Sequence, residues 1–521
     1  MIMNYTYNGG KINQKTIIGH PSGLYVLFFT EMWERFSYYG MRAILVLFLV
    51  SSFQDGGWGW ERSEALGLYG IYTGLVYITP ILGGILADKF LGYRNAVIIG
   101  ALIMTLGHAS MSLEIFSDLL FYLGLVFLII GNGFFKPNIS SIVGQLYKTE
   151  GRDKDAGYTI FYMGINSGAF LGILLCGYIG EKIGWHYGFG LAGIFMFFGM
   201  LQFYYAQKIF GSIGLIEKSN IIENENQNLS NIENKISSKI IYDRLAVIVI
   251  FSFCVIFFWW AFEQAGGSMT IFASDYTNRI LEGGGALIFK IFNSLITVVP
   301  MLIITYIVYL LSLNTFSTYK LSSIFLIVSF FIIWLIIIWM LSREFNNTST
   351  EVPASWYGIL NSFFIIVFAP LISKIWQSKY NISGPYKFGI GLILLAIGFA
   401  ILSFGSINIP LGAKTASVSM IFLILAYFFH TMGELCISPV GLSYVSKLAP
   451  KNLVGLMFGV WFVANFIANT AAGFTGSYID PIVENYGMSV FFLIFTIIPT
   501  AAGVIMLLAN NLIVKMMHGI K

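Results

Sequence analysis

The sequence has few charged residues for its length. Only 10% of its 521 residues are charged, whereas 57% are hydrophobic and 17% are aromatic. A typical soluble domain has about 25% charged residues. The apolar residues exceed what buried cores of this length could hold. This excludes an ordinary soluble globular protein and indicates that lipid covers much of the chain.

Cysteines and concentrated positive charge are also scarce. Cys176, Cys254 and Cys436 lie in apolar stretches, which excludes a disulfide framework and a CxxC-type metal site. The net charge is only +4 and the basic residues form no run, so we expect no nucleic-acid partner. HExxH, GxSxG and P-loop motifs are missing and the polar loops are short. We therefore expect no enzyme, no cofactor and no metal.

Long apolar stretches dominate the rest of the chain. A helix needs about 20 mostly apolar residues to cross a bilayer, and fourteen stretches meet this requirement. Their approximate limits are 23–51, 64–88, 95–114, 118–147, 156–180, 187–209, 243–273, 285–312, 320–342, 353–377, 386–405, 415–447, 455–478 and 487–516. No alternation of apolar and polar residues competes with this pattern, so we predict an all-α membrane protein.

The basic residues predict an orientation. If the N-terminus is cytoplasmic, twenty lysines and arginines fall on the cytoplasmic side and six on the other. Because cytoplasmic loops carry the excess of positive charge, we expect both termini to be cytoplasmic. The six residues of the opposite side are Arg62, Lys182, Arg279, Lys290, Arg343 and Lys414.

A polar stretch divides the chain into two halves. Residues 211–243 contain no crossing segment and predict a flexible cytoplasmic linker. Six spans precede it and eight follow, and six-helix halves are a common transporter plan. We therefore predict an N-terminal bundle over 1–210 and a C-terminal bundle over 244–521. The almost wholly apolar residues 285–342 are the best candidate for an inserted helix pair that faces lipid.

The first span carries charge that must remain inside the membrane. Helical spacing places one set of residues on a single face, with Tyr39 at its edge: Glu31, Glu34, Arg35, Tyr38 and Arg42. Each ion costs roughly 2.5–3.5 kcal/mol near the bilayer centre. One interpretation is an ion cluster that only holds helices together. A polar stripe that faces an aqueous cavity is better supported.

The remaining membrane charges are divided between the halves. Lys136 lies in the first half, and Glu263 and Glu434 lie deep in the second. A buried ammonium group requires a carboxylate partner, so pairs between the halves would neutralise both sets. Such pairs can break and reform as the halves move. Because burial and a nearby cation shift a carboxyl pKa in opposite directions, protonation can depend on the partner.

Several motifs together resemble one family. The first half contains EMWERFSYYG (31–40), GGILADKFLGYR (83–94), GNGFFKPNISSIVGQLY (131–147) and GYTIFYMGINSGAF (157–170). The second half contains FEQAGGS (262–268), VPASWYGILNSFFIIVFAP (352–370), HTMGELCISPVGLS (430–443) and MFGVWFVANFIAN (457–469). These stretches resemble the bacterial proton-dependent oligopeptide transporters (POT/PTR2) of the major facilitator superfamily. The resemblance implies that superfamily's fold, two six-helix bundles, with two additional helices here.

The resemblance also implies roles for individual residues. The implied proton-coupling residues are Glu31, Glu34, Arg35, Lys136, Glu263 and Glu434. The implied substrate-binding residues are Arg35, Tyr38, Tyr39, Arg42, Tyr77, Lys136, Asn166, Trp259, Glu263, Asn361, Glu434 and Trp461, with Trp260 an alternative to Trp259. The implied gating pairs are Arg42 with Glu263 and Lys136 with Glu434.

The function implied by the resemblance is proton-coupled import of di- and tripeptides by alternating access. Its partners would be peptides, protons and the lipid bilayer of the bacterial inner (plasma) membrane, and a monomer would suffice. The alternative is another small substrate on the same scaffold: nitrate or another anion, an amino acid or a modified peptide. Bacterial members usually carry their extra helix pair between the sixth and seventh core helices. Here the pair follows FEQAGGS, so the resemblance implies no role for it.

Overall fold

The protein is almost entirely helical, as predicted. The computed structural model describes residues 2–7, 10–147, 151–216, 238–378, 381–450 and 453–520. In this part, thirteen helices are long and apolar enough to cross a membrane. Helix α1 (Ser22–Val50) is also long enough to cross, with 29 residues, but it differs from the thirteen helices by its charged face. Together they match the fourteen predicted stretches.

Some predictions concern residues outside the described part. They are the linker interior, 217–237, and the basic residues Lys148, Lys218, Lys235, Lys379, Lys451 and Lys521. At the two borders of the linker, a short 3-10 helix η4 ends at Phe210 and helix α8 begins at Ser238.

The chain divides into two compact units. Unit 1 comprises Met1–Gly59, Thr79–Ile216 and Asn278–Ser362. Unit 2 comprises Trp60–Ile78, Glu217–Thr277 and Phe363–Lys521. Two helices, α2 (Arg62–Leu86) and α12 (Ile359–Gln377), therefore have residues in both units.

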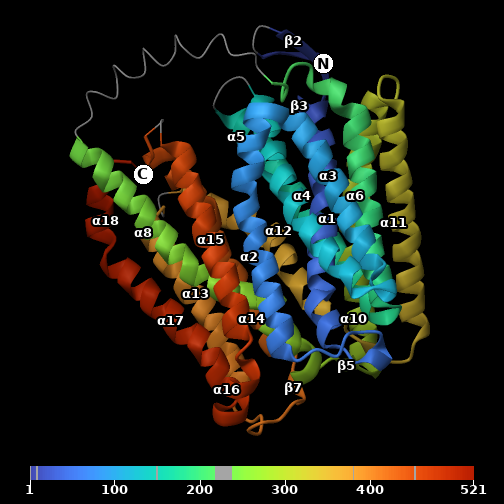
Figure 1. Ribbon diagram of the computed structural model, residues 1–521, viewed down its shortest axis with the longest axis vertical. Coiled ribbons are helices and arrows are strands. Elements are labelled where there is room, and N and C mark those ends of the chain that lie inside the picture. The colour runs from blue at the N-terminus through green and yellow to red at the C-terminus, as the bar shows by residue number, and fades with distance from the viewer. Residues whose placement is uncertain are drawn as a thin grey trace. The chain divides into compact units, whose positions relative to one another are not determined.

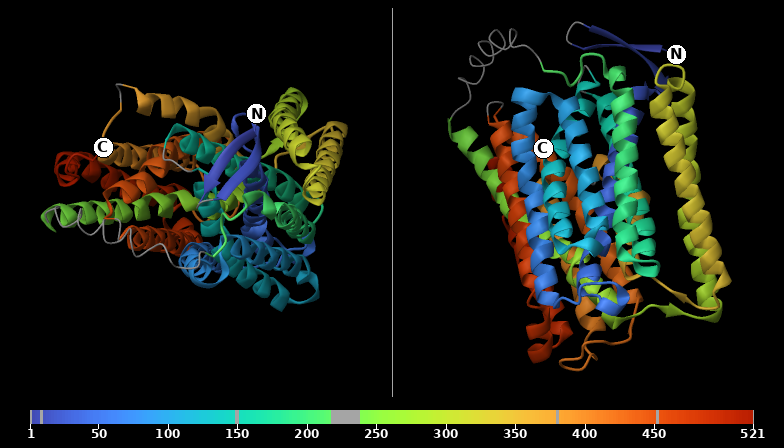
Figure 2. Two further views of the ribbon diagram at one scale, coloured as in Figure 1. Left: turned by 90° about the horizontal axis from the view of Figure 1, so that it is seen from above. Right: turned by 45° about the vertical axis from the view of Figure 1, so that its right-hand side comes forward.

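Unit 1 is built around α1. It packs against α5 (Arg152–Lys182) and α6 (Trp185–Ala206), while α3 (Tyr93–Ser112) packs against α4 (Asp118–Gln145) and α6 (Figure 1). Two long helices, α10 (Gly283–Thr315) and α11 (Lys320–Asn346), correspond to the predicted inserted pair, and α11 packs against α6 (Figure 2). Short elements complete the unit. They are strands β1 (Ile2–Tyr7), β2 (Gly10–Ile17), β3 (His20–Pro21), β5 (Ile280–Leu281) and β6 (Thr350–Glu351), the 3-10 helices η1 (Phe53–Asp55), η3 (Glu114–Phe116) and η7 (Ala354–Gly358), and the π-helix η2 (Ala87–Leu91).

Glycines allow α1 and α5 to approach closely. Gly164, Gly168 and Gly172 recur every four residues along one face of α5. A Cβ atom at Gly168 would collide with the carbonyl oxygen of Met32, and one at Gly172 with that of Phe36. Small residues at this spacing are typical of close helix crossings in membranes. The stripe therefore fixes which face of α1 turns away from α5.

Unit 2 is built from five long helices. They are α8 (Ser238–Phe262), α13 (Gly384–Gly405), α14 (Ile421–Leu448), α15 (Val454–Gly476) and α17 (Met488–Leu508). α13 packs against α14 and α17, and α15 packs against α8. Shorter elements are α9 (Ser268–Ile271), α16 (Ile479–Tyr486), α18 (Asn510–Met516), β7 (Val418–Ser419), the 3-10 helix η5 (Glu263–Gly266) and the π-helix η6 (Phe272–Tyr276). Strand β4 (Thr277–Asn278) has one residue in each unit.

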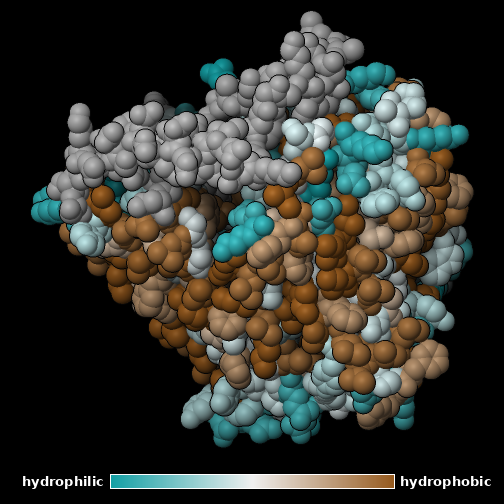
Figure 3. Space-filling view, turned by 45° about the horizontal axis from the view of Figure 1, so that its top comes forward, coloured by the Kyte–Doolittle hydropathy of each residue, from teal (hydrophilic) through white to brown (hydrophobic). Residues whose placement is uncertain are grey.

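The surface has the polarity expected in a bilayer. Figure 3 shows hydrophobic side chains along the helices and hydrophilic ones toward the helix ends. Exposed large side chains on the inserted pair include Ile288, Leu302, Phe331 and Ile338. Because these side chains have no protein neighbours to cover them in unit 1, lipid is the environment that suits them.

Candidate functional site

The charged face of α1 folds into a buried ion cluster. The Nε atom of Arg35 lies 2.7 Å from Oε1 of Glu31 and 2.9 Å from Oε2 of Glu34. The three side chains are at most 6% exposed. One guanidinium thus faces two carboxylates, and burial makes each of these contacts stronger than it would be in water. With both carboxylates ionised, the three side chains together carry a net charge of −1.

A second helix, α4, completes the cluster. Asn132 is buried, and its Nδ2 atom donates a hydrogen bond to Oε1 of Glu34 at 3.1 Å. Lys136 follows one turn later, is half-buried and interacts electrostatically with Glu34. Lys136 therefore acts electrostatically on the first-helix cluster. Its charge alone predicts a carboxylate partner in the second half. Sequence reasoning missed Asn132, although its place one turn before Lys136 in GNGFFKPN was a signal.

Aromatic rings extend the same face of α1. The guanidinium of Arg42 lies 6.0 Å from the ring centre of Tyr38 and 5.9 Å from that of Tyr39. The two tyrosine rings meet edge to face with centres 5.1 Å apart. Arg42 and Tyr39 are half-buried and Tyr38 is buried. This arrangement offers a cation together with apolar ring surface, which suits a charged ligand with a variable side chain.

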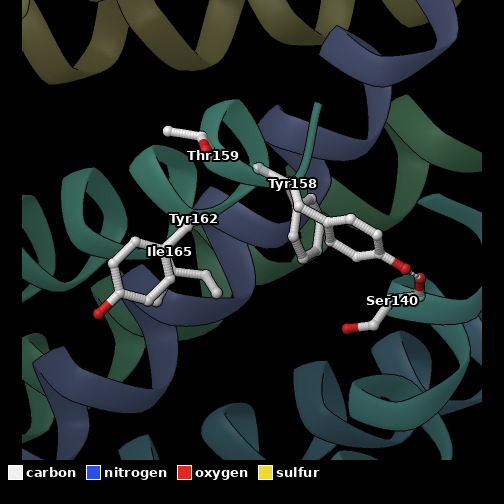
Figure 4. A pocket seen from close by; sticks show the side chains of 6 residues that line it. Ser140, Tyr158, Thr159, Tyr162 and Ile165 are labelled. Carbon is white, nitrogen blue, oxygen red and sulfur yellow. Dashed lines mark hydrogen bonds between the residues drawn. The ribbon is translucent and has the colours of Figure 1, made fainter. Parts of the chain in front are cut away.

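A pocket of about 390 Å³ lies between α4 and α5 in unit 1. It is lined by Ser140, Tyr158, Thr159, Phe161, Tyr162 and Ile165. Figure 4 shows the Tyr158 hydroxyl directed toward Ser140, to whose carbonyl it donates at 3.5 Å.

The pocket lies one helical turn from two predicted substrate residues. Ser140 follows Lys136 by one turn on α4, and Tyr162 precedes Asn166 by one turn on α5. Asn166 is buried, and its Nδ2 atom donates to the Tyr162 carbonyl at 3.0 Å. Sequence reasoning missed these tyrosines, which recur at helical spacing within GYTIFYMGINSGAF.

In unit 2, a predicted carboxylate lies at a break in a helix. α8 ends at Phe262, and Glu263 opens the 3-10 turn η5. Glu263 is 3% exposed, and the Tyr69 hydroxyl donates to its Oε2 atom at 3.5 Å. Gln264 holds the turn by donating to the Ala472 carbonyl at 2.9 Å. The backbone leaves helical geometry at Gly267 (φ −117°, ψ −103°), so Glu263 lies in the tight turn just before the interruption. Discontinuous helices are a recurrent way of building ion and substrate sites within membranes.

The structure gives the two adjacent tryptophans, Trp259 and Trp260, different environments. Trp260 is buried; its Nε1 atom donates to Oγ1 of Thr475 at 2.9 Å and its ring centre lies 4.8 Å from that of Phe495. These contacts commit Trp260 to packing inside unit 2. Trp259 is half-buried and contacts only its helix neighbours Phe258 and Phe262 among the ring pairs found in the described residues. Trp259 is therefore the better candidate for a substrate contact.

The other predicted site residues are placed as follows. In unit 2, Glu434 and Trp461 are buried and Tyr77 is half-buried, whereas Asn361 is half-buried in unit 1. Each predicted gating pair takes one residue from each unit: Arg42 and Lys136 from unit 1, and Glu263 and Glu434 from unit 2.

Comparison with known proteins identifies similar chains. The family model described as PTR2, POT family, matches residues 94–246 and 332–489. A di-/tripeptide transporter of Lactococcus lactis subsp. cremoris is 31% identical, over 98% of this chain and 99% of that protein. The peptide transporter YePEPT of Yersinia enterocolitica is 32% identical, over 89% of each chain.

Solved structures agree with the sequence comparison. The crystal structure of a peptide transporter POT variant in complex with alafosfalin superposes with a TM-score of 0.75 at 27% identity. The match covers 97% of this chain and 98% of that one. The similarity therefore extends over nearly the whole fold.

Proposed function

We propose that this chain, which belongs to the POT family, imports di- and tripeptides together with protons by alternating access. The observation that carries the proposal is the buried cluster in which Arg35 faces both Glu31 and Glu34. Relatives that match almost its whole length are named di-/tripeptide or peptide transporters.

Proton coupling follows from the charge of this cluster. Two buried carboxylates share one guanidinium, so one negative charge is left for a proton or for the ammonium group of Lys136. A proton on Glu31 or Glu34 would release Lys136 to bind the carboxylate of a peptide. Loss of the proton would return Lys136 to the cluster and release the peptide. We also propose proton-coupling roles for Glu263 and Glu434, which are buried carboxylates of unit 2.

Peptide recognition requires opposite charges at a fixed separation. We assign the peptide carboxylate to Arg35 and Lys136, and the terminal amine to Asn166, Asn361 and Glu434. The aromatic residues Tyr38, Tyr39, Tyr77, Trp259 and Trp461 would accept side chains. Because rings and hydroxyl groups adapt to many side chains, we propose broad specificity.

The pairs Arg42–Glu263 and Lys136–Glu434 are proposed as gates. Each joins a cation of unit 1 to a carboxylate of unit 2. Such pairs can form on one side of the membrane while the other side opens.

We also propose the membrane, the orientation and the oligomeric state of the protein. We place it in the bacterial plasma membrane with both termini in the cytoplasm, because of the excess of basic residues on that side. We propose a functional monomer that transports without catalysing a reaction and without a cofactor. Its halves, 1–210 and 244–521, would be joined by the linker at 211–243, with the inserted pair near 285–342.

Uptake of labelled dialanine into proteoliposomes tests this function. An inside-alkaline, inside-negative gradient should drive accumulation, since each proton gains about 2.3 kcal/mol per 100 mV. Glu34→Gln and Lys136→Gln should abolish driven uptake but retain counterflow. Glu484→Gln, which changes an exposed carboxylate on α16, is the matched control. Uptake that responds to neither the gradient nor an uncoupler would exclude proton coupling. Nitrate or single amino acids that compete with labelled dialanine more strongly than unlabelled peptides do would favour the alternative substrates.

A further inference from the structure

The chain segments that enter and leave the inserted helix pair are joined to each other. Ile280 pairs with Glu351 and Leu281 with Thr350 in the antiparallel ladder of β5 and β6. Arg279 extends the ladder: its carbonyl accepts from the Val352 amide at 3.0 Å, and its Nη1 atom donates to the Val352 carbonyl at 2.6 Å. We call residues 279–281 and 350–352 the neck of the pair.

Charge binds the neck to the end of α5. Nζ of Lys182 lies 2.6 Å from one carboxylate oxygen of Glu351, and Nη2 of Arg279 lies 3.0 Å from the other. Lys182 is the last residue of α5, so one carboxylate joins the neck to the N-terminal half of the sequence.

The residues just after the neck are held by the same helix. Glu181 accepts hydrogen bonds from the amides of Ala354 and Ser355, at 2.8 and 2.9 Å, and from the Ser355 hydroxyl. Trp356 donates through Nε1 to the Leu174 carbonyl at 3.0 Å. The last turns of α5 therefore satisfy backbone groups that the start of η7 would otherwise leave without partners.

Apolar contacts join the inserted pair to the same bundle along its length. The ring of Phe330 on α11 lies 5.6 Å from Phe29 and 5.4 Å from Trp33 on α1. Phe325 stacks on Tyr205 of α6 at 5.7 Å.

Hydrogen bonds add to these contacts. The Ser322 hydroxyl donates to the Gln202 carbonyl at 2.8 Å, and Tyr178 donates to buried Glu344 at 2.7 Å. The pair is thus bound to α1, α5 and α6 at both ends and in between.

These contacts cross the border between the predicted halves. α5 and α6 belong to the predicted N-terminal bundle, 1–210, whereas the pair lies in the sequence of the C-terminal bundle, 244–521. In alternating access the two halves move as bodies against each other. The pair can therefore follow only one of them, and close-packed contacts are kept intact during rigid-body motion.

We propose that residues 279–356, with the inserted pair, are a strap fixed to the N-terminal bundle and move with it throughout the transport cycle. The moving body then differs from the half defined by the sequence, because the chain passes into unit 1 after Thr277 and leaves it after Ser362. This inference rests on the proposed function for its motion, but the attachment is a property of unit 1 alone.

Reversible cross-linking tests the strap. In the reconstituted full chain, Lys182→Cys with Glu351→Cys is linked by a short bis-methanethiosulfonate reagent and later released by a reductant. We expect the linked protein to take up dialanine at the rate of the released protein. Linked protein that loses uptake, and regains it on reduction, would show that α5 and the neck must separate, and would overturn the strap.

Two controls complete the experiment. Thr315→Cys with Ser323→Cys links α10 to α11 at their connecting turn, where the two hydroxyl oxygens lie 2.9 Å apart. This link should leave uptake unchanged, and it measures the effect of the reagent. The single variant Lys182→Cys, treated identically, measures the effect of modifying one residue.

A spectroscopic measurement separates the strap from the proposed function. Nitroxides at Tyr204→Cys on α6 and Leu335→Cys on α11, both exposed positions, report the distance between strap and bundle. We expect the same distance distribution at acid and neutral pH, with and without dialanine. A second distance under any of these conditions would overturn the strap. If the unmodified protein takes up no dialanine, the proposed function fails, and this distance still decides the strap.

Discussion

At the scale of single residues, the site depends on a balance of buried charges. Arg35 cannot neutralise Glu31 and Glu34 together, so neutral donors and Lys136 decide how the excess charge is held. Asn132 is the neutral donor to Glu34. A hydrogen bond to a buried carboxylate is worth about 1.5–3 kcal/mol, enough to influence protonation.

Asn132→Ala removes this donor. We expect driven dialanine uptake to fall by about tenfold, which corresponds to ~1.4 kcal/mol of lost stabilisation. Proteoliposome uptake measures the effect, with counterflow as the parallel readout. Asn485→Ala, at an exposed position of α16, is the matched control and should behave as the unmodified protein. Normal driven uptake by Asn132→Ala would remove this residue from the coupling mechanism.

Glu351 gives a pH dependence outside the membrane segments. Burial raises its pKa, but the bonds from Lys182 and the charge of Arg279 outweigh burial and hold the pKa below its ordinary value of 4.5. A lowered pKa means that the stability Glu351 contributes is complete above pH 4.5 and is lost as the pH falls through the lowered value.

Glu351→Gln should therefore lower the thermal unfolding temperature at neutral pH, and the difference from the unmodified protein should vanish in acid. The effect should stay below about 1 kcal/mol, because water screens partly exposed pairs. Unfolding in detergent from pH 7 down to pH 3 measures it. A difference that grew as the pH fell would contradict a lowered pKa for Glu351.

At the scale of helices, the crossing of α1 and α5 positions the charged cluster. Gly168 contacts the backbone of α1 at Met32, between Glu31 and Glu34 in the sequence. Any side chain at this position must push the two helices apart.

Gly168→Ala should destabilise the protein by about 1–3 kcal/mol, the usual cost of overpacking. It should also reduce driven uptake, because the cluster on α1 shifts. Gly455→Ala on α15 is the control, since a Cβ atom there meets nothing within 4 Å. Thermal unfolding of Gly168→Ala and Gly455→Ala measures the difference in stability. Equal unfolding temperatures of the two variants would show that the crossing of α1 and α5 tolerates a side chain.

Sequence periodicity predicts helices well but predicts their interruptions poorly. The predicted span 243–273 corresponds to α8, η5, α9 and η6, with Glu263 at the first break. FEQAGGS contains glycines, which do not specify whether a helix breaks or merely packs closely. The break is decided by tertiary partners: Gln264 bonds to the Ala472 carbonyl, and the Tyr427 hydroxyl bonds to the Ala265 carbonyl at 3.2 Å.

At the scale of the whole molecule, ligand binding should appear as stability. A ligand that binds only the native state at about 100 times its Kd adds ~2.7 kcal/mol. Dialanine and trialanine should therefore raise the unfolding temperature in a concentration-dependent way, whereas alanine should not. A screen of di- and tripeptides that shifted nothing would contradict peptide binding.

Tertiary structure also decides how the sequence is divided. The sequence order suggests six helices before the linker and eight after it, yet residues 278–362 belong to unit 1. Lys182 and Glu351 are 169 positions apart, and the sequence around either residue does not predict that the two form an ion pair.

The sequence by itself determined the membrane class, the helical stretches and the charged face of α1, because hydropathy and the 3.6-residue period act over one helix at a time. It also predicted that Lys136 needs a carboxylate partner, through the cost of leaving a charge unpaired, but it expected that partner in the second half. Only the tertiary structure decided that Asn132 binds Glu34, that Trp260 packs inward, that the helix breaks at Glu263 and that the inserted pair is attached to unit 1. Each of these depends on which helices lie side by side, and that choice is made by close packing between residues far apart in the chain.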